Sequence, residues 1–112
     1  MKSLTRLLLM FVPVMLAAGA GAQTQNETQD PITHGQELAK EFCSGCHAIG
    51  RTGKSRNEEA PPFRRLDRSV DLDNFFQRLR RGLTSGHPDM PEFKFNSADA
   101  RAMRDYLRSV QE

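Results

Sequence analysis

Three stretches of the chain carry apolar side chains at helical spacing, and polar segments rich in Gly and Pro separate them. The first stretch runs from Gly35 to Cys43, with its apolar stripe at Gly35, Leu38, Ala39 and Phe42. This i, i+3, i+4, i+7 pattern is typical of one face of a helix. We therefore expect a short helix that ends at Cys43.

The other two stretches also carry the residues that begin and end helices. Residues 71–81 start with Asp71, end in arginines and are followed by Gly82, the order that suits the helix dipole and a C-terminal cap. Residues 96–110 open with Asn96 and keep an apolar face of Ala102, Met103, Tyr106, Leu107 and Val110. No segment alternates apolar and polar positions as a strand does. The predicted class is all-α, with three main helices and long loops.

The first 22 residues follow a different pattern. Lys2 and Arg6 precede an apolar run at 7–18, and small residues follow at 20–22. This order is typical of a cleaved secretory signal peptide. The run is short for a membrane anchor and contains Pro13. We expect cleavage after residue 22 and export to the periplasm, with no stable membrane span afterwards. The exported part should consist of a flexible polar leader at 23–33 and a folded domain at 34–112.

Composition narrows the function of the exported part. The signal holds two of the 16 basic residues, so 14 Lys and Arg face 14 Asp and Glu in residues 23–112. A near-neutral domain lacks the basic field that nucleic-acid binding requires. Only 16 of those residues are Leu, Ile, Val or Phe, which is below the ~20% at which a self-sufficient core becomes doubtful. We expect a prosthetic group to complete the core.

Cys43-Ser44-Gly45-Cys46-His47 indicates which group this is. Cys-x-x-Cys-His is the attachment sequence of c-type haem, in which two thiols reach two vinyl groups and the imidazole binds iron. An exported disulfide or a thioredoxin-like redox pair is one alternative, although the latter needs a βαβ setting. A zinc site that recruits His34 or His87 is another.

Met90 is the candidate for the second axial ligand of the iron. It lies between Pro88 and Pro91, whose fixed φ angles stiffen an extended strap. The competitors are His87, which precedes Pro88, and Met103, which the apolar stripe of the last helix explains as core. We expect Met90 to bind the iron.

Residues 34–110 resemble a class I cytochrome c of the short, single-haem bacterial type. The matching residues are Gly35, the Cys43–His47 motif, Pro61-Pro62-Phe63, the segment 86–91, Met103 and Tyr106-Leu107. The resemblance implies a small cytochrome c fold around one covalent haem c, in which Gly35 admits Tyr106 where the first and last helices cross. It also implies that Pro61, or else Pro62, offers its carbonyl to His47.

The function expected from these features is one-electron transfer without enzymatic chemistry, between a protein donor and a protein acceptor, by a monomer or small subunit. A haem with both axial positions filled has no place for a substrate. The alternatives are a haem subunit of a periplasmic dehydrogenase, and a haem enzyme or gas-binding protein with a labile sixth ligand.

Two arginine runs, at 64–68 and 78–81, have no assigned role. They either surround the haem edge, where they steer an acidic partner or pair with a haem propionate, or form a solvated face with nearby aspartates.

Overall fold

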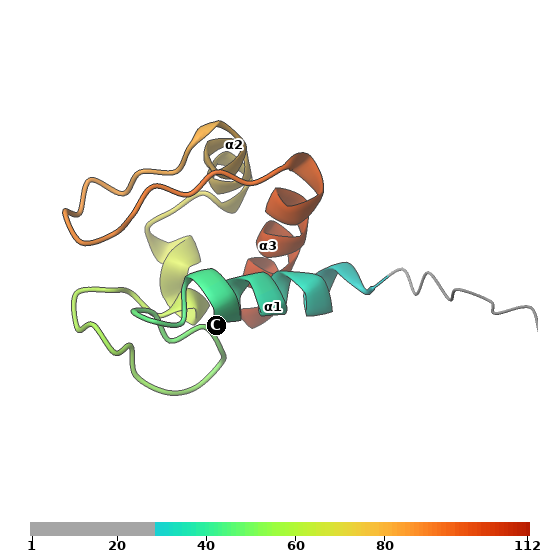
Figure 1. Ribbon diagram of the computed structural model, residues 1–112. Helices are drawn as coiled ribbons and strands as arrows, with labels where there is room; N and C mark the ends of the chain where they lie inside the picture. The colour runs from blue at the N-terminus through green and yellow to red at the C-terminus, as the bar shows by residue number, and fades with distance from the viewer. Residues whose placement is uncertain (1–28) are drawn as a thin grey trace, which may run out of the picture.

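The computed structural model describes residues 29–112, so the predicted signal peptide and most of the predicted leader lie outside the described residues. The element order is α1 (Pro31–Phe42), the 3₁₀ helix η1 (Phe63–Arg68), α2 (Leu72–Arg81) and α3 (Ser97–Val110) (Figure 1). Within this range the extended pairing is a single isolated bridge between Leu83 and Phe93. The predicted all-α fold with three main helices and long loops is confirmed.

The first helix begins earlier than the apolar pattern predicts. Asp30 caps it by accepting a hydrogen bond from the Thr33 amide at 3.0 Å, and Pro31 occupies the first turn, where a missing N–H costs nothing. Residues 31–33, which the sequence places in the flexible leader, are therefore helical. His34 Nε2 also lies 2.6 Å from Asp99 Oδ1, which ties the start of α1 to the first turn of α3.

The second and third helices have the predicted bounds because their caps are local. Asp71 accepts hydrogen bonds from the amides of Asp73 and Asn74, both at 2.8 Å, and Gly82 follows α2 with a φ of 123°. Asn96 caps α3 by accepting from the Asp99 amide at 2.9 Å. Side-chain oxygens at these positions satisfy amides that the helix leaves free.

The core forms where α1 crosses α3 and α2 packs beside α3 (Figure 1). All five residues predicted for the apolar face of α3 are buried. The Tyr106 hydroxyl donates to the Ile49 carbonyl at 2.9 Å, which ties the loop after the Cys-x-x-Cys-His motif to α3. The buried cluster comprises Ala39, Phe63, Leu66, Leu79, Leu83, Ala100, Met103, Tyr106, Leu107 and Val110.

Gly35 makes the crossing of α1 and α3 close. A Cβ atom at this position would lie 2.6 Å from the Ala102 carbonyl carbon, 2.7 Å from Tyr106 Cβ and closer still to the Ala102 oxygen. Two of these three atoms are backbone, which cannot rotate away as a side chain can. The predicted approach of Gly35 to Tyr106 is confirmed.

Gly35→Ala should therefore destabilise the fold even though alanine favours helices. Overpacking costs about 3 kcal/mol and helix propensity returns about 1 kcal/mol, which leaves a loss of about 2 kcal/mol. Thermal unfolding should show a Tm roughly 10 °C lower. Gly50→Ala is the matched control, because no atom lies within 4 Å of a Cβ there. Equal Tm values for the two variants would contradict the close crossing.

The sequence pattern did not predict η1, which the side chain of Gln111 holds from the far end of the chain. Its amide nitrogen donates to the Phe63 carbonyl at 2.7 Å and to the Leu107 carbonyl at 2.6 Å. Its oxygen accepts from the Asp67 amide at 2.9 Å. Phe63 and Leu66 of η1 thereby pack into the core.

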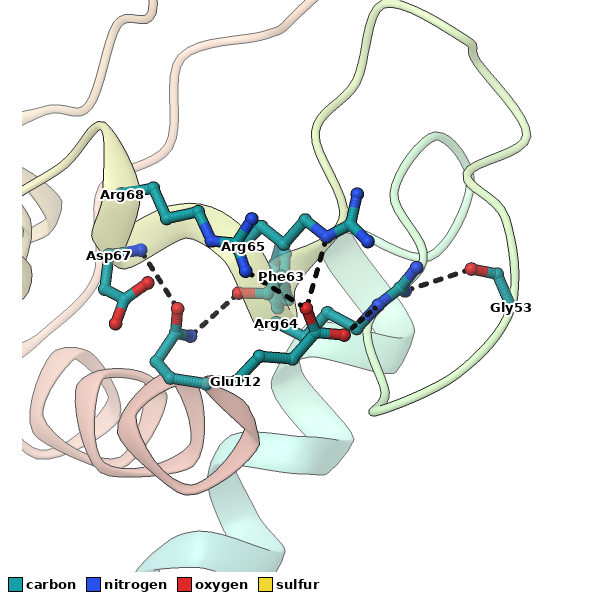
Figure 2. A network of polar contacts seen from close by, with 8 residues as sticks. Gly53, Phe63, Arg64, Arg65, Asp67, Arg68 and Glu112 are labelled. Atoms are coloured by element: carbon teal, nitrogen blue, oxygen red, sulfur yellow. Dashed lines mark hydrogen bonds and ion pairs between the residues drawn. The ribbon is translucent and has the colours of Figure 1, made fainter.

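Figure 2 shows three arginines of η1 gathered around Glu112. Arg64, Arg65 and Arg68 approach its carboxylate to 3.0, 3.2 and 3.4 Å. The hydrogen bond from Arg65, followed by the positive charges of the three arginines, lowers the pKa of Glu112. The first arginine run therefore has a carboxylate partner within the chain.

Among the described residues, no helix is both long and apolar enough to cross a bilayer.

Candidate functional site

A cavity of about 340 Å³ opens between the end of α1, η1, α2 and the loop 82–96. A small-molecule or cofactor site has this size and character, with apolar walls and a few converging polar groups. All five residues named from the sequence lie on its wall: Cys43, Cys46, His47, Pro61 and Met90. The apolar part of the wall is formed mainly by Phe63, Leu66, Val70, Phe75, Leu79, Leu83, Phe93 and Phe95.

The end of α1 places the two cysteines on one side of the cavity. Cys43 caps the helix, and the chain then turns so that the His47 amide donates to the Cys43 carbonyl at 2.9 Å. Burial, followed by the charge of the neighbouring Cys46, raises the pKa of Cys43 to about 11. Cys43 is therefore a neutral thiol at neutral pH. Redox-active cysteine pairs instead have lowered pKa values, which disfavours the thioredoxin-like alternative.

A hydrogen bond fixes the orientation of the His47 ring. Its Nδ1 lies 2.7 Å from the Pro61 carbonyl oxygen. Because a carbonyl only accepts, Nδ1 carries the proton and Nε2 keeps its lone pair for a metal. The Phe63 amide donates to the Ala48 carbonyl at 2.9 Å and holds the same segment in place. Of the two prolines considered, Pro61 rather than Pro62 makes this contact.

Met90 comes from a loop that is closed at its base. Leu83 and Phe93 exchange backbone hydrogen bonds of 2.7 and 3.1 Å, and the Phe95 amide donates to the Leu79 carbonyl at 2.9 Å. Within this loop Met90 is half-buried. The loop thus holds a thioether on the cavity wall without regular secondary structure.

The two competitors of Met90 line the same cavity but are engaged by other groups. His87 Nε2 lies 2.6 Å from Glu59 Oε2, so this imidazole faces a carboxylate. Met103 also touches the wall, but it is only 1% exposed and belongs to the core cluster. Met90, which is half-buried on the same wall, stays the candidate for the second ligand.

The donor set fits a haem better than a zinc ion. Two thiols share an apolar cavity with the imidazoles of His47 and His87 and the thioethers of Met90 and Met103, a set that matches covalent attachment and axial ligation by His and Met. Zinc would need a cluster of nitrogen, thiolate or carboxylate ligands. Residues 29–112 contain no group of three or more His, Cys, Asp or Glu side chains that could hold a metal ion. His34, one proposed zinc ligand, faces Asp99 instead.

The match to known proteins agrees with this geometry. Residues 30–107 match the family described as cytochrome C oxidase, cbb3-type, subunit III. The chain belongs to this family. It is also 28% identical over 78 residues to cytochrome c-552 of Bradyrhizobium diazoefficiens, which covers 70% of this chain and 73% of the relative. No solved structure matches the chain. The protein is a small c-type cytochrome, an electron-carrier haem protein.

The structure separates the arginines of this cytochrome into different roles. Arg78 lies on the cavity wall and donates a hydrogen bond to the Thr84 carbonyl. Arg80 instead stacks its guanidinium 5.7 Å from the ring centre of Phe76. The runs in the sequence do not distinguish these residues. Helical spacing gives no signal either, because Arg78 and Arg80 each lie one position from the buried Leu79 on α2.

Proposed function

We propose that this cytochrome carries single electrons in the periplasm, with one haem c bound through Cys43 and Cys46 and ligated by His47 and Met90. The observation that carries the proposal is the meeting of these four side chains on one apolar cavity wall. When bound, the haem supplies an iron that alternates between Fe(III) and Fe(II).

Each of these side chains has a distinct task. The Pro61 carbonyl holds the His47 ring in one tautomer, which raises the basicity of Nε2 as a ligand. Met90 contributes a soft sulfur that favours the reduced ion. The surrounding Phe and Leu side chains exclude water, which also favours the less charged state. Arg78 is placed to pair with a carboxylate of the cofactor.

The test is the intact mass and the absorption spectrum of the exported protein. The mass should equal the chain from Gln23 plus one haem, and reduction with dithionite should sharpen the visible bands. A mass equal to the bare chain would overturn covalent attachment. A mass that includes the haem but begins at residue 1 would overturn only the predicted signal cleavage.

A second candidate function is that of a haem subunit in a larger respiratory complex, which the family description favours. The electron-transfer site would be the same in both cases. Native purification from both the soluble and the detergent-solubilised membrane fractions of its own cells distinguishes them: a free carrier elutes at the size of one chain, whereas a subunit elutes with its complex.

A further inference from the structure

Three phenylalanines form an aromatic patch on the surface beside the cavity. Phe42 at the end of α1 is 42% exposed and lines both the cavity and a second hollow. Its ring meets Phe95 and Phe93 edge-on, with centroids 5.4 and 6.4 Å apart, and those two rings stack at 6.3 Å. We call these three residues the aromatic patch.

The aromatic patch has two sides. One side lines the cavity, and the other lines a second hollow whose wall contains none of the cysteines, His47 or Met90. The second hollow is therefore separate from the residues proposed to hold the haem. Phe42 also directly precedes Cys43, so a molecule that covers the aromatic patch lies next to the proposed attachment site.

The charges around this second hollow are mostly negative. Glu41, Glu92 and Asp99 lie on its wall, against the single positive charge of Lys94. Lys40, the nearby basic residue of α1, is about 160° around the helix from Phe42 and therefore faces away. Asp99 is already engaged with His34. Glu41 and Glu92 thus contribute the open negative charge beside the aromatic patch.

The arginines lie outside the wall of the second hollow. Arg64, Arg65 and Arg68 surround Glu112. Arg78 lines the cavity instead, where it donates a hydrogen bond to the Thr84 carbonyl. Most charged residues of the second hollow are therefore carboxylates.

We propose that the aromatic patch is the docking surface for a redox protein that presents lysine or arginine side chains around an apolar spot. The inference rests on the proposed function, because it names the partner for the same haem edge. The exposed rings supply apolar contact area, and the carboxylates supply complementarity to a cationic partner. Complementary charge of this kind chiefly raises the rate of productive encounter.

The first test compares two small reductants of opposite charge in stopped-flow reactions with the oxidised holoprotein. Hexaammineruthenium(II) loses one electron to the haem iron, and so does hexacyanoferrate(II). Lowering the ionic strength from 1 M to 0.01 M extends the Debye length from about 3 to about 30 Å. The ruthenium rate should then rise by about tenfold and the hexacyanoferrate rate should fall. The opposite salt dependence, or none, would overturn the inference.

Charge-removing variants test which carboxylates cause the salt dependence. Glu41→Gln with Glu92→Gln should remove most of the salt dependence. Asp67→Asn with Asp73→Asn is the matched control, because it removes the same net charge from residues outside both cavity walls. Equal effects of the two double variants would overturn the local assignment. If neither reductant exchanges electrons with the wild type, the proposed function itself is wrong.

The second test maps the surface directly. Decalysine added to the reduced holoprotein should shift the amide resonances of residues 41–42 and 92–95. The same titration of Glu41→Gln with Glu92→Gln should give weaker shifts there. Shifts centred on another face, or none at millimolar decalysine, would overturn the docking surface.

Discussion

Replacing both Cys43 and Cys46 by alanine should leave the exported chain largely without stable helices. The expected cause is the loss of the group that fills the cavity, since five residues of the core cluster also line its wall: Phe63, Leu66, Leu79, Leu83 and Met103. Empty cavity volume costs about 24 cal/mol per Å³, so 340 Å³ corresponds to an upper bound of about 8 kcal/mol. That is comparable with the whole stability of a small domain, about 5–15 kcal/mol.

Far-ultraviolet circular dichroism of the purified double variant provides the measurement. Ser44→Ala is the control, because Ser44 lies between the two cysteines and donates only to the Lys40 carbonyl. It should keep both the haem and the helices. Native helicity in the double-cysteine variant would show that the apolar side chains suffice for folding. It would contradict the prediction that the cofactor completes the core.

Met90→Ala should change the iron site while leaving the fold intact. The variant should lose the weak red absorption band of a sulfur–iron(III) bond and bind carbon monoxide rapidly when reduced. Its reduction potential should fall by roughly 0.1–0.3 V, a part of the ~0.8 V range that axial ligands set. Visible spectra and a potentiometric titration provide the measurements.

His87→Ala is the control that distinguishes Met90 from His87 as the second axial ligand of the iron. Its imidazole faces Glu59 in the structure, so its removal should leave the red band and the potential nearly unchanged. If His87→Ala removes the ligand signature and Met90→Ala does not, the protein has a bis-histidine haem of lower potential.

The sequence predicts most of this fold because most of its helix signals are local. Asp71, Gly82 and Asn96 cap their helices with groups at most four residues away, so inspection of neighbouring positions is enough. Apolar periodicity places the start of α1 too late, because the Asp30 cap and Pro31 lie before the first residue of the apolar stripe.

The 3₁₀ helix η1 could not be predicted from neighbouring residues, because distant parts of the chain hold it. Its backbone is held by Gln111, which lies 48 residues after Phe63 and 44 after Asp67. The partner of its arginines, Glu112, is equally distant. The pattern around residues 61–68 carries no trace of these contacts. The candidate site is easier to predict from the sequence than η1, because covalent attachment and ligation of a haem require particular residue types at fixed spacing. The choice of protein partner is harder to predict, because it depends on surface charges that only the folded chain brings together.

The crossing of α1 with α3 sets the order in which this molecule can assemble. These helices are the first and last of the described elements, and the close approach of Gly35 to Ala102 joins them. A chain growing from its N-terminus therefore presents Cys43, Cys46 and His47 long before α3 exists to close the core. Contacts of such high sequence separation form late and slowly. The helix crossing that completes the core is thus the last of these helix contacts to become possible.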